Sequence, residues 1–509
     1  MQPLPTRPKL VSGPSRHVYD AIVLGGQLGG ALSAALLAKR GYRVLLVEHD
    51  GLGVGYEHGD YLLPYAPFVS PGLKAMPAAE DAFNELGLST TIQRGLKPST
   101  PGLQLILARH RMDLFVDPAK SAAEFRRELG PAGGDHFQAA FENLIRMHEP
   151  TDGYFRKPEH FPPGAWLDRW SFSRGCKPFP GLTAAAPEPV DHPAARLLFS
   201  LAPFISYLAA PTPLLLARTL SSVLDASSRY PGGREGLREV VMKKLTDLGG
   251  DYLGQETGGS SVVEQLSFEG GKLLGVKVLE SDTVYRAPYF IASTDAGALR
   301  RLIPEKNRQR SLSNALELLT MPRFLFTVNW VCPAELMPKG MGELLLMETE
   351  PQLGPLLIQV TPARKRAGRV EDESLRVVCV AASVPSSIRE LGEAHMQTLA
   401  ERISSHLDSL FPFLRSRLLL RSAPYLDAGG VRGSRLLPHP LYAVDPEHSA
   451  LGLTGLNPQT PTKNLFLANR EVFPGLGLEG ELLAAVQAAD RVQGLLNKAN
   501  PLAGNSQRF

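Results

Sequence analysis

The stretch from Ala21 to Glu48 decides the fold; it reads AIVLGGQLGGALSAALLAKRGYRVLLVE. A short apolar run leads into four glycines, a helix-period segment follows, and a second apolar run closes the stretch. Glycines between a strand and a helix let backbone N–H groups at the helix start approach a diphosphate. The stretch therefore predicts a βαβ unit of an α/β, Rossmann-like domain that binds a dinucleotide.

Five positions form the predicted phosphate-binding turn: Gly25, Gly26, Gln27, Gly29 and Gly30. Glu48 ends the next strand, close to the spacing of about 20 residues expected of a carboxylate that binds ribose hydroxyls. Gln27 stands where the fingerprint has its second glycine, at which the backbone normally approaches the pyrophosphate. Either the diphosphate follows a shifted path at this turn or its binding site is weakened. The alternative interpretation of the whole motif is a tight strand–helix turn in an α/β domain that binds no nucleotide.

Composition limits the class of protein. A chain of 509 residues is long enough for two or three structural units. Its 54 basic and 51 acidic residues give a net charge of only +3, so nucleic acid is not an expected partner. Three cysteines without a C-x-x-C spacing, Cys176, Cys332 and Cys379, indicate buried small residues rather than disulfides or a metal site.

Neither a leader nor a membrane span is expected. Residues 1–17 lack the apolar stretch of a secretory signal, which favours a cytoplasmic protein. The most apolar region, residues 197–224, is interrupted by three prolines and Arg218, whereas a spanning helix needs about 20 predominantly apolar residues.

The remaining periodicity divides the chain into alternating segments. Strands are expected at 324–332, 375–384 and 465–468, and helices at 235–247, at 395–410 and from about Gly480 onward. We therefore expect a discontinuous dinucleotide-binding domain and an inserted, mixed α+β substrate-binding domain. The expected ranges are 18–75, 225–305 and 425–500 for the first domain, 76–224 and 306–424 for the second, and 1–17 and 501–509 for flexible tails.

Four blocks together resemble the phytoene desaturase and carotenoid oxidoreductase family of FAD-dependent flavoproteins. They are residues 19–48, YPGG at 230–233 followed by Val263, ASTDA at 292–296, and NLFLANREVFPGLGLEG at 464–480. The resemblance implies a two-dinucleotide-binding flavoprotein fold with FAD as cofactor. It places the backbone of Val263 against the adenine and the closing block against the flavin, through Glu471, Gly475, Leu476 and Gly477.

The resemblance also implies an activity. Members of the family desaturate, saturate or isomerise C–C and C=C bonds of a polyene, isoprenoid or lipid-like substrate, and the flavin itself carries the redox chemistry. We name no catalytic residue. One alternative is a non-catalytic lipid-binding or partner-binding protein with weakened or absent FAD, because Asn469 and Arg470 stand where the family has glycine and an acidic residue. A second alternative is a flavin amine oxidase.

Three further features allow two interpretations each. The apolar residues 199–224 line a hydrophobic tunnel or touch a membrane surface, or they are ordinary buried core. The basic cluster Arg364-Lys365-Arg366 contacts anionic lipid or forms an exposed loop. The histidines at 58, 110 and 439 are isolated in sequence and are expected at the surface or hydrogen bonded. The sequence does not indicate the oligomeric state.

Overall fold

The computed structural model describes most of the chain outside the two ends. The described residues are 17–49, 55–70, 72–73, 76–146, 192–210, 212–226, 228–254, 262–279, 282–307, 313–314, 317–427, 439–445, 449 and 452–499. Cys176 and nearly all of the predicted tails lie outside them.

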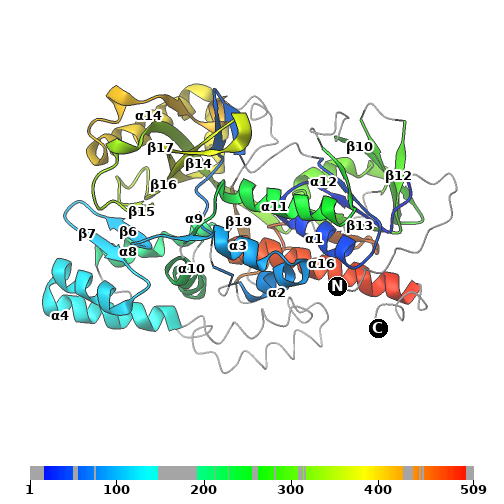
Figure 1. Cartoon of the computed structure of the whole chain (residues 1–509), viewed down its shortest axis with the longest axis horizontal. Helices are drawn as coiled ribbons and strands as arrows, with labels where there is room; N and C mark the ends of the chain where they lie inside the picture. Colours follow the sequence, from blue (N-terminus) through cyan, green and yellow to red (C-terminus); the bar gives the residue numbers. More distant parts are fainter. Residues whose placement is uncertain are drawn as a thin grey trace, which may run out of the picture.

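The molecule has two halves, and a parallel five-stranded sheet forms the centre of the half that contains residues 21–47 (Figure 1). Its strand order is β20 (Leu465–Leu467), β13 (Tyr289–Ala292), β1 (Ala21–Leu24), β2 (Val44–Val47) and β9 (Asp251–Leu253). All four residues of β1 and of β2 are buried, as expected for strands covered on both faces. The predicted Rossmann-like α/β unit is confirmed.

Helices cover one face of this sheet. Helix α1 (Leu28–Lys39) packs between α11 (Gly233–Asp247) and α16 (Gly477–Ala499), with α2 (Pro77–Leu86) alongside. Every residue of α1 except the last is buried, and many are alanine or glycine, so its neighbours approach closely. The start of α1 is therefore surrounded by other elements.

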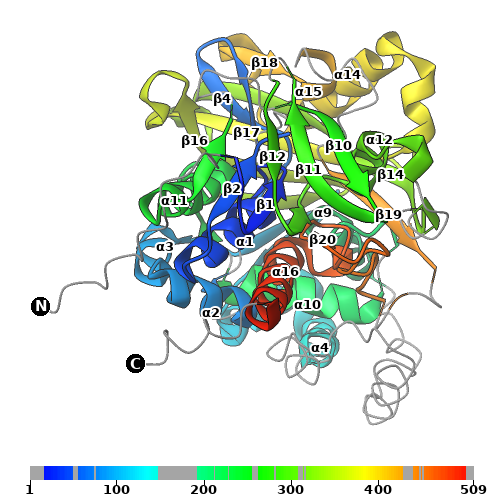
Figure 2. The same cartoon turned by 90° about the vertical axis from the view of Figure 1, so that its right-hand side faces the viewer.

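A small antiparallel sheet covers the opposite face (Figure 2). It consists of β10 (Val263–Glu269), β11 (Lys272–Val278) and β12 (Val284–Arg286). The side chains of Ile22 and Leu24 join its core cluster, whereas those of Ala21 and Val23 join the cluster under α1 and α16. The first strand is therefore buried on both faces, and the predicted phosphate-binding turn follows its carboxyl end.

A second, larger sheet forms the other half of the molecule. Its long central strands are β14 (Leu319–Pro333), β17 (Glu371–Pro385) and β16 (Leu356–Lys365), and α14 (Glu393–Leu410) packs against one face. β14, β17 and α14 are the predicted strands and helix with longer bounds, whereas β16 was not predicted. The hairpin β3 (Gly55–His58) and β4 (Tyr61–Pro64) and the strand β19 (Pro440–Val444) also pair into this sheet. Residues 55–64 and 440–444 therefore belong to the second sheet.

The apolar region 197–224 is mostly core, and Phe204, Ile205 and Tyr207 within it also line a pocket. It forms α8 (Pro193–Phe199), α9 (Ala202–Ile205) and α10 (Pro213–Ala226). Most of their described apolar side chains join a buried cluster with the second sheet, whereas Ala202, Leu214 and Leu215 join the cluster of the first sheet. Among the described residues, no helix has the length and apolar character required to cross a bilayer. Cys332 and Cys379 are buried and free on β14 and β17, as predicted for small core residues.

Candidate functional site

Three glycines of the predicted phosphate-binding turn are required by packing. A Cβ atom at Gly25 would lie 2.8 Å from the Thr294 nitrogen, and Gly25 has a φ of +101°. A Cβ at Gly29 would lie 2.5 Å from the Ala468 oxygen, and one at Gly30 would lie 2.2 Å from the Gly25 oxygen. The glycines therefore let β1 and α1 approach the ends of β13 and β20, whatever the turn binds.

Gln27 does not share this crowding. It is the N-cap residue of α1, without a side-chain capping hydrogen bond, and it lines a pocket. The one position of the turn that faces open space is therefore the one that carries a long side chain.

The start of α1 is bonded to a carboxylate from α16. The Gly29 N–H donates to Glu481 Oε1 at 3.0 Å, and Glu481 is only 1% exposed. Helix N-termini attract anions through their free N–H groups and the helix dipole. A dinucleotide diphosphate would use the same end of α1, so the Glu481 carboxylate stands in for it.

Arg234 completes this arrangement. Its guanidinium donates to the second oxygen of Glu481 and to the Tyr207 hydroxyl, the latter at 2.7 Å. Burial works against the charged form, but Glu481 and Tyr207 keep the pKa of Arg234 above its ordinary value. Helices α1, α11 and α16 are thereby tied together by one buried ionic group.

The predicted ribose ligand is also engaged. The Tyr252 hydroxyl donates to Glu48 Oε2 at 2.6 Å, and Arg238 lies 3.4 Å from Oε1. The Glu48 side chain lies against the turn, because a Cβ at Gly26 would be 3.0 Å from its Cγ. Burial and Glu48 both raise the pKa of Tyr252, which keeps its hydroxyl a donor.

A histidine occupies the predicted adenine contact. The Val263 N–H donates to His49 Nδ1 at 3.0 Å. An imidazole nitrogen is the same kind of acceptor as a ring nitrogen of adenine, so this backbone group is satisfied internally.

The closing block forms its own buried network. Glu471 accepts from the Ala296 N–H at 2.6 Å, from the Tyr442 hydroxyl at 3.0 Å and from Asn469 Nδ2 at 3.1 Å. Burial raises the pKa of Glu471 to about 7. Arg470 bonds both oxygens of Asp295, at 3.2 and 2.7 Å. Asn469 and Arg470, which depart from the family pattern, thus hold the turn to the end of β13.

The turn predicted to face the flavin lies against another segment. Gly477 has a φ of +56°, and a Cβ there would be 2.3 Å from the Ile205 oxygen. The Tyr207 N–H donates to the Pro474 oxygen at 2.7 Å. Gly475 is buried against Leu453, and Leu476 is partly buried in the adjoining core. The chain after α9 therefore packs directly onto this turn.

Taken together, the residues do not fit FAD in this arrangement. A bound FAD would have to displace the partners of Gly29, Glu48 and Val263, each of which already has an intramolecular hydrogen bond. The side chain at the phosphate-binding end of α1 is Glu481 rather than the predicted obstacle, Gln27. Nothing in the linear sequence indicated this contact, since 452 positions separate Glu481 from Gly29.

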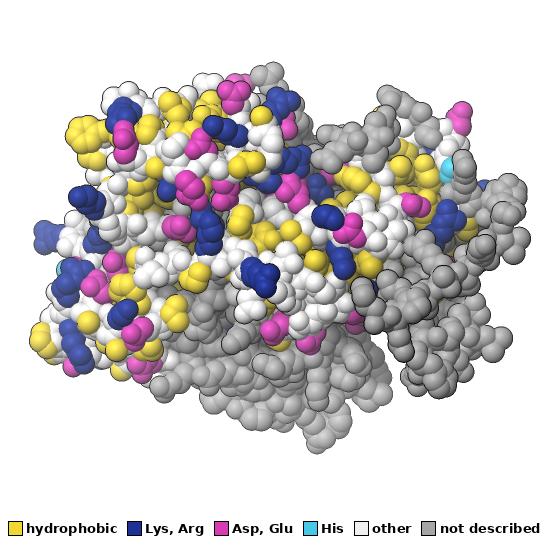
Figure 3. Space-filling model, in the orientation of Figure 1, with side chains coloured by type: hydrophobic (Ala, Val, Ile, Leu, Met, Phe, Trp, Pro, Cys, Tyr) yellow, Lys and Arg dark blue, Asp and Glu magenta, His cyan; other side chains and the backbone are white. Residues whose placement is uncertain are grey.

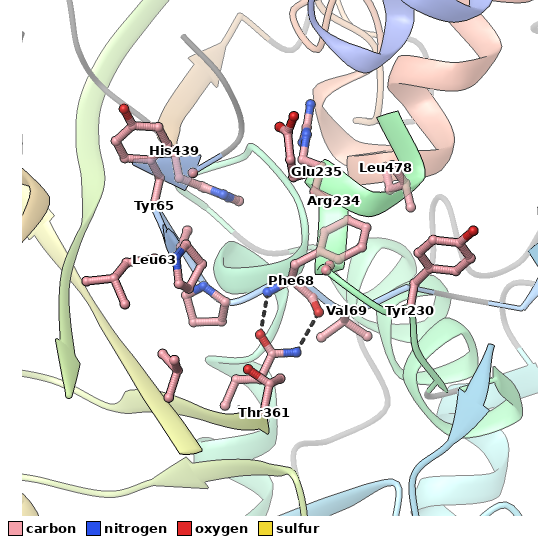
Figure 4. A pocket seen from close by; sticks show the side chains of 18 of the residues that line it. Leu63, Tyr65, Phe68, Val69, Tyr230, Arg234, Glu235, Thr361, His439 and Leu478 are labelled. Carbon is pink, nitrogen blue, oxygen red and sulfur yellow. Dashed lines mark hydrogen bonds between the residues drawn. The ribbon is translucent and has the colours of Figure 1, made fainter. Parts of the chain in front are cut away.

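A pocket opens beside Gln27, between the two halves of the molecule (Figure 4). It has an open volume of about 160 Å³, similar to the roughly 150 Å³ cavity that accepts benzene. One wall is the chain from Leu62 to Val69, and the Gln359 amide holds this wall by bonding the Phe68 N–H and oxygen at 2.8 and 2.5 Å. The opposite wall is the start of α11, including Arg234 and Glu235.

Of the three isolated histidines, only His439 reaches this pocket. It is buried, stacks on Tyr207 at 4.6 Å between ring centroids and bonds the Ser206 oxygen at 2.9 Å. Burial lowers its pKa to about 3, so it is neutral and satisfied. His58 lies on β3, and His110 lies 3.2 Å from Glu128. In the described part of the chain, no group of three or more His, Cys, Asp or Glu side chains could hold a metal ion.

The basic cluster at 364–366 is not one exposed loop. Arg364 is 11% exposed and lines the pocket, which corrects the predicted exposed loop at this position. Lys365 and Arg366 point outward and pair with Asp372 and Glu57, each at 2.8 Å. On the face shown in Figure 3, basic and acidic side chains are interspersed.

The fold is a Rossmann-like α/β unit joined to a second, larger sheet. Residues 23–86 match the family model of the NAD(P)-binding Rossmann-like domain. An oxidoreductase from Methanosarcina mazei is similar at 15% identity and a TM-score of 0.57, over 94% of this chain and 99% of the other. Cyclohexylamine oxidase from Brevibacterium oxydans is similar at 16% identity and a TM-score of 0.54, with the same coverage.

Putrescine oxidase is similar too, at 14% identity and a TM-score of 0.54, over 94% and 99% of the two chains. A comparison with curated proteins found no match. The likeness to these oxidases extends over nearly the whole chain, so it confirms the predicted fold class.

Proposed function

We propose that this protein is a non-catalytic binding protein built on the fold of flavin-dependent oxidoreductases, and that it takes a small ligand into the pocket beside Gln27. The observation that carries the proposal is the hydrogen bond from the Gly29 N–H to Glu481. The helix end that would receive the FAD diphosphate is already neutralised by a buried carboxylate, which is itself paired with Arg234.

Flavin content tests the proposal. The protein is produced with riboflavin in the medium, purified, and examined for the absorption bands of flavin, then titrated with FAD by calorimetry. We expect a colourless protein and no heat of FAD binding at tens of micromolar. Yellow protein with about one flavin per chain would overturn the proposal.

A second candidate is an FAD-dependent oxidoreductase, and the fold likeness to named oxidases favours it. Its substrate would be a polyene, isoprenoid or lipid-like molecule, as the family resemblance implies, or an amine. Oxygen uptake with putrescine or cyclohexylamine tests whether the substrate is an amine, and conversion of a polyene tests whether it is a polyene, isoprenoid or lipid-like molecule. Turnover by flavin-loaded protein with any of them would replace the binding function by an enzymatic one.

The cellular setting belongs to the same proposal. We propose a cytoplasmic protein that takes its ligand from solution or from a membrane surface. Fractionation of cells, followed by a salt wash of the membrane pellet, distinguishes the two sources.

A further inference from the structure

One wall of the pocket contains a short segment that belongs to no helix or sheet. We call residues 66–69 the strap; they are Ala66, Pro67, Phe68 and Val69, and all four line the pocket. Within the described part of the chain, the strap makes no backbone–backbone hydrogen bond, and only Pro67 is fully buried. Segments with few hydrogen bonds and partly exposed side chains open more readily than the strands beside them. We therefore expect the strap to open before the sheets unfold.

The chain is held in place on both sides of the strap. Before it, the Asn329 Nδ2 group on β14 donates to the Pro64 oxygen at 2.8 Å. The ring of Tyr65 stacks on that of Tyr56, with the ring centroids 5.2 Å apart. After it, Ser70 is only 3% exposed. An opening movement is therefore confined to the few residues between these points.

One side chain supplies the hydrogen bonds that the strap has within the described structure. Gln359 Oε1 accepts from the Phe68 N–H at 2.8 Å, and Gln359 Nε2 donates to the Phe68 oxygen at 2.5 Å (Figure 4, dashed lines). A residue in an antiparallel sheet exchanges the same two bonds with its partner, but here both come from one amide. Loss of that amide therefore frees the strap from all of its described hydrogen bonds.

The remaining contacts of the strap are apolar and reach two separate cores. Phe68 packs against the cluster under α1 and α16, and Val69 packs against the cluster that α8, α9 and α10 share with the second sheet. Both side chains are only partly buried. Apolar contacts are not directional, so they favour the closed position without defining it as hydrogen bonds do. The Gln359 amide therefore sets the position of the strap.

We propose that the strap opens and closes the pocket, and that Gln359 is the positioning residue that keeps it closed. The closed pocket has an open volume of about 160 Å³, room for about one aromatic ring. When the strap moves away, the space that it occupied joins the pocket, so a larger ligand can enter. The inference rests on the proposed binding function for the purpose of this opening, whereas its test needs no ligand.

A buried cysteine reports the opening. Cys379 on β17 pairs in register with Gln359 on β16, so the two side chains lie side by side on one face of the sheet. Cys379 is 1% exposed, and burial raises the pKa of its thiol, so a thiol reagent reacts with it only after an opening. Cys332 is buried in the cluster under α14, on the other face, and reports unfolding of the sheet itself.

The wild-type protein gives the first test. The purified full-length chain is treated with N-ethylmaleimide, and the labelled peptides are quantified by mass spectrometry over time. We expect Cys379 to react at least tenfold faster than Cys332, at a rate that stays nearly constant in urea below the unfolding transition. Equal rates, or the same steep dependence on urea for both thiols, would overturn the proposal, because Cys379 would then be reached only by unfolding.

Two variants test the role of the amide. Gln359→Leu and Gln359→Glu both keep a side chain of similar size, so Cys379 is not uncovered by a smaller neighbour. Leucine makes neither hydrogen bond, and the glutamate, ionised at neutral pH, places an oxygen where the Phe68 oxygen needs a donor. We expect the Cys379 rate to rise at least tenfold in both, with the Cys332 rate unchanged. Tenfold corresponds to about 1.4 kcal/mol, which the loss of two neutral hydrogen bonds can supply.

Gln104→Leu is the matched control. Gln104 lies on β6 (Leu103–Ile106), and its amide also bonds a backbone N–H and a backbone oxygen, those of Gly342 at 2.6 Å and Gly340 at 3.0 Å. Its loss should leave the ratio of the two cysteine rates as in wild type. The proposal fails if the ratio rises as much in this control as in the Gln359 variants, or if it stays unchanged in the Gln359 variants.

Flavin content separates this inference from the proposed function. It is measured by absorption on the same preparations that are labelled. A yellow protein contradicts the proposed function, and the labelling result stands beside it. A colourless protein whose Cys379 rate does not respond to the Gln359 variants contradicts only the opening of the strap.

Discussion

Glu481 lies on α16 and accepts a hydrogen bond at 3.0 Å from the backbone N–H of Gly29, at the start of α1. The contact uses the property for which dinucleotide folds employ this helix end, its affinity for an anion, but the anion is part of the chain. Two further groups predicted to bind the nucleotide also have internal partners: the Val263 N–H donates to His49, and Glu48 accepts from the Tyr252 hydroxyl. Internal hydrogen bonds thus engage the three groups that the sequence predicted to bind a dinucleotide.

The Glu481–Arg234 pair should be costly to break from one side. Glu481→Ala leaves a buried guanidinium without its carboxylate, and removal of one partner of a buried pair costs about 3–5 kcal/mol. The double variant Glu481→Ala/Arg234→Met removes both charges and should recover most of this loss. Urea unfolding of the two single variants and the double variant gives the coupling energy.

An exposed pair on the same helix is the control for that cycle. Lys243 and Asp247 on α11 are 2.8 Å apart, with side chains 75% and 53% exposed. Lys243→Ala should change the free energy of unfolding by less than about 1 kcal/mol. A similar small change in Glu481→Ala would mean that the carboxylate does not hold Arg234.

The glycines of the turn should matter without any nucleotide. In Gly30→Ala the new methyl group would sit 2.2 Å from the Gly25 oxygen and 2.8 Å from Ser293 Cβ, so the backbone must move. Overpacking of this kind costs about 1–3 kcal/mol, and we expect a lower urea midpoint in the absence of added FAD.

Gly494→Ala provides the matched comparison. This glycine lies inside α16 with nothing within 4 Å of a Cβ, so alanine should stabilise the helix by about 0.5–1 kcal/mol. If Gly30→Ala did not lower the free energy of unfolding any more than Gly494→Ala, β1 and α1 would not pack as closely as described.

The sequence predicted the layers well because their signal is local. The apolar runs that became β1 and β2, and the periodic run that became α1, are each contained in a few neighbouring residues. The state of the site depends on contacts between distant segments. Arg234 and Glu481 are ordinary charged residues of two helices in the sequence, and only the packing of α11 and α16 beside α1 brings them together. Arg364 was misplaced for the same reason.

Removal of the internal anion should open the site to an external one. In Glu481→Ala, the Gly29 N–H and the Arg234 guanidinium lose their shared carboxylate and can receive a phosphate. We expect the affinity for ADP, measured by calorimetry, to rise at least tenfold over wild type, and Gln27→Gly in the same background to raise it further.

Glu481→Gln separates charge from space. The amide oxygen still accepts from Gly29 and the volume is unchanged, so ADP affinity should stay close to that of wild type. Equal gains in the alanine and glutamine variants would show that charge alone, rather than occupancy of the helix end, kept ADP out.

Glu471 should make stability depend on pH in a direction opposite to that of most carboxylates. Burial raises its pKa from 4.5 to about 7, with the Asp295 carboxylate acting in the same sense. The folded state therefore holds a proton that the unfolded chain releases between these values, so stability is present at low pH and is lost as the pH rises through 7. In Glu471→Gln this loss disappears, because the amide does not titrate. Between pH 4.5 and pH 8, the free energy of unfolding of the wild type should therefore fall by on the order of 3 kcal/mol relative to that of Glu471→Gln.

The control is Glu335→Gln, which changes an exposed carboxylate paired with Arg417. The pH dependence of its unfolding free energy should be parallel to that of wild type. If the Glu471→Gln curve were also parallel, Glu471 would be ionised throughout, and the hydrogen bonds from Ala296 and Tyr442 would outweigh its burial.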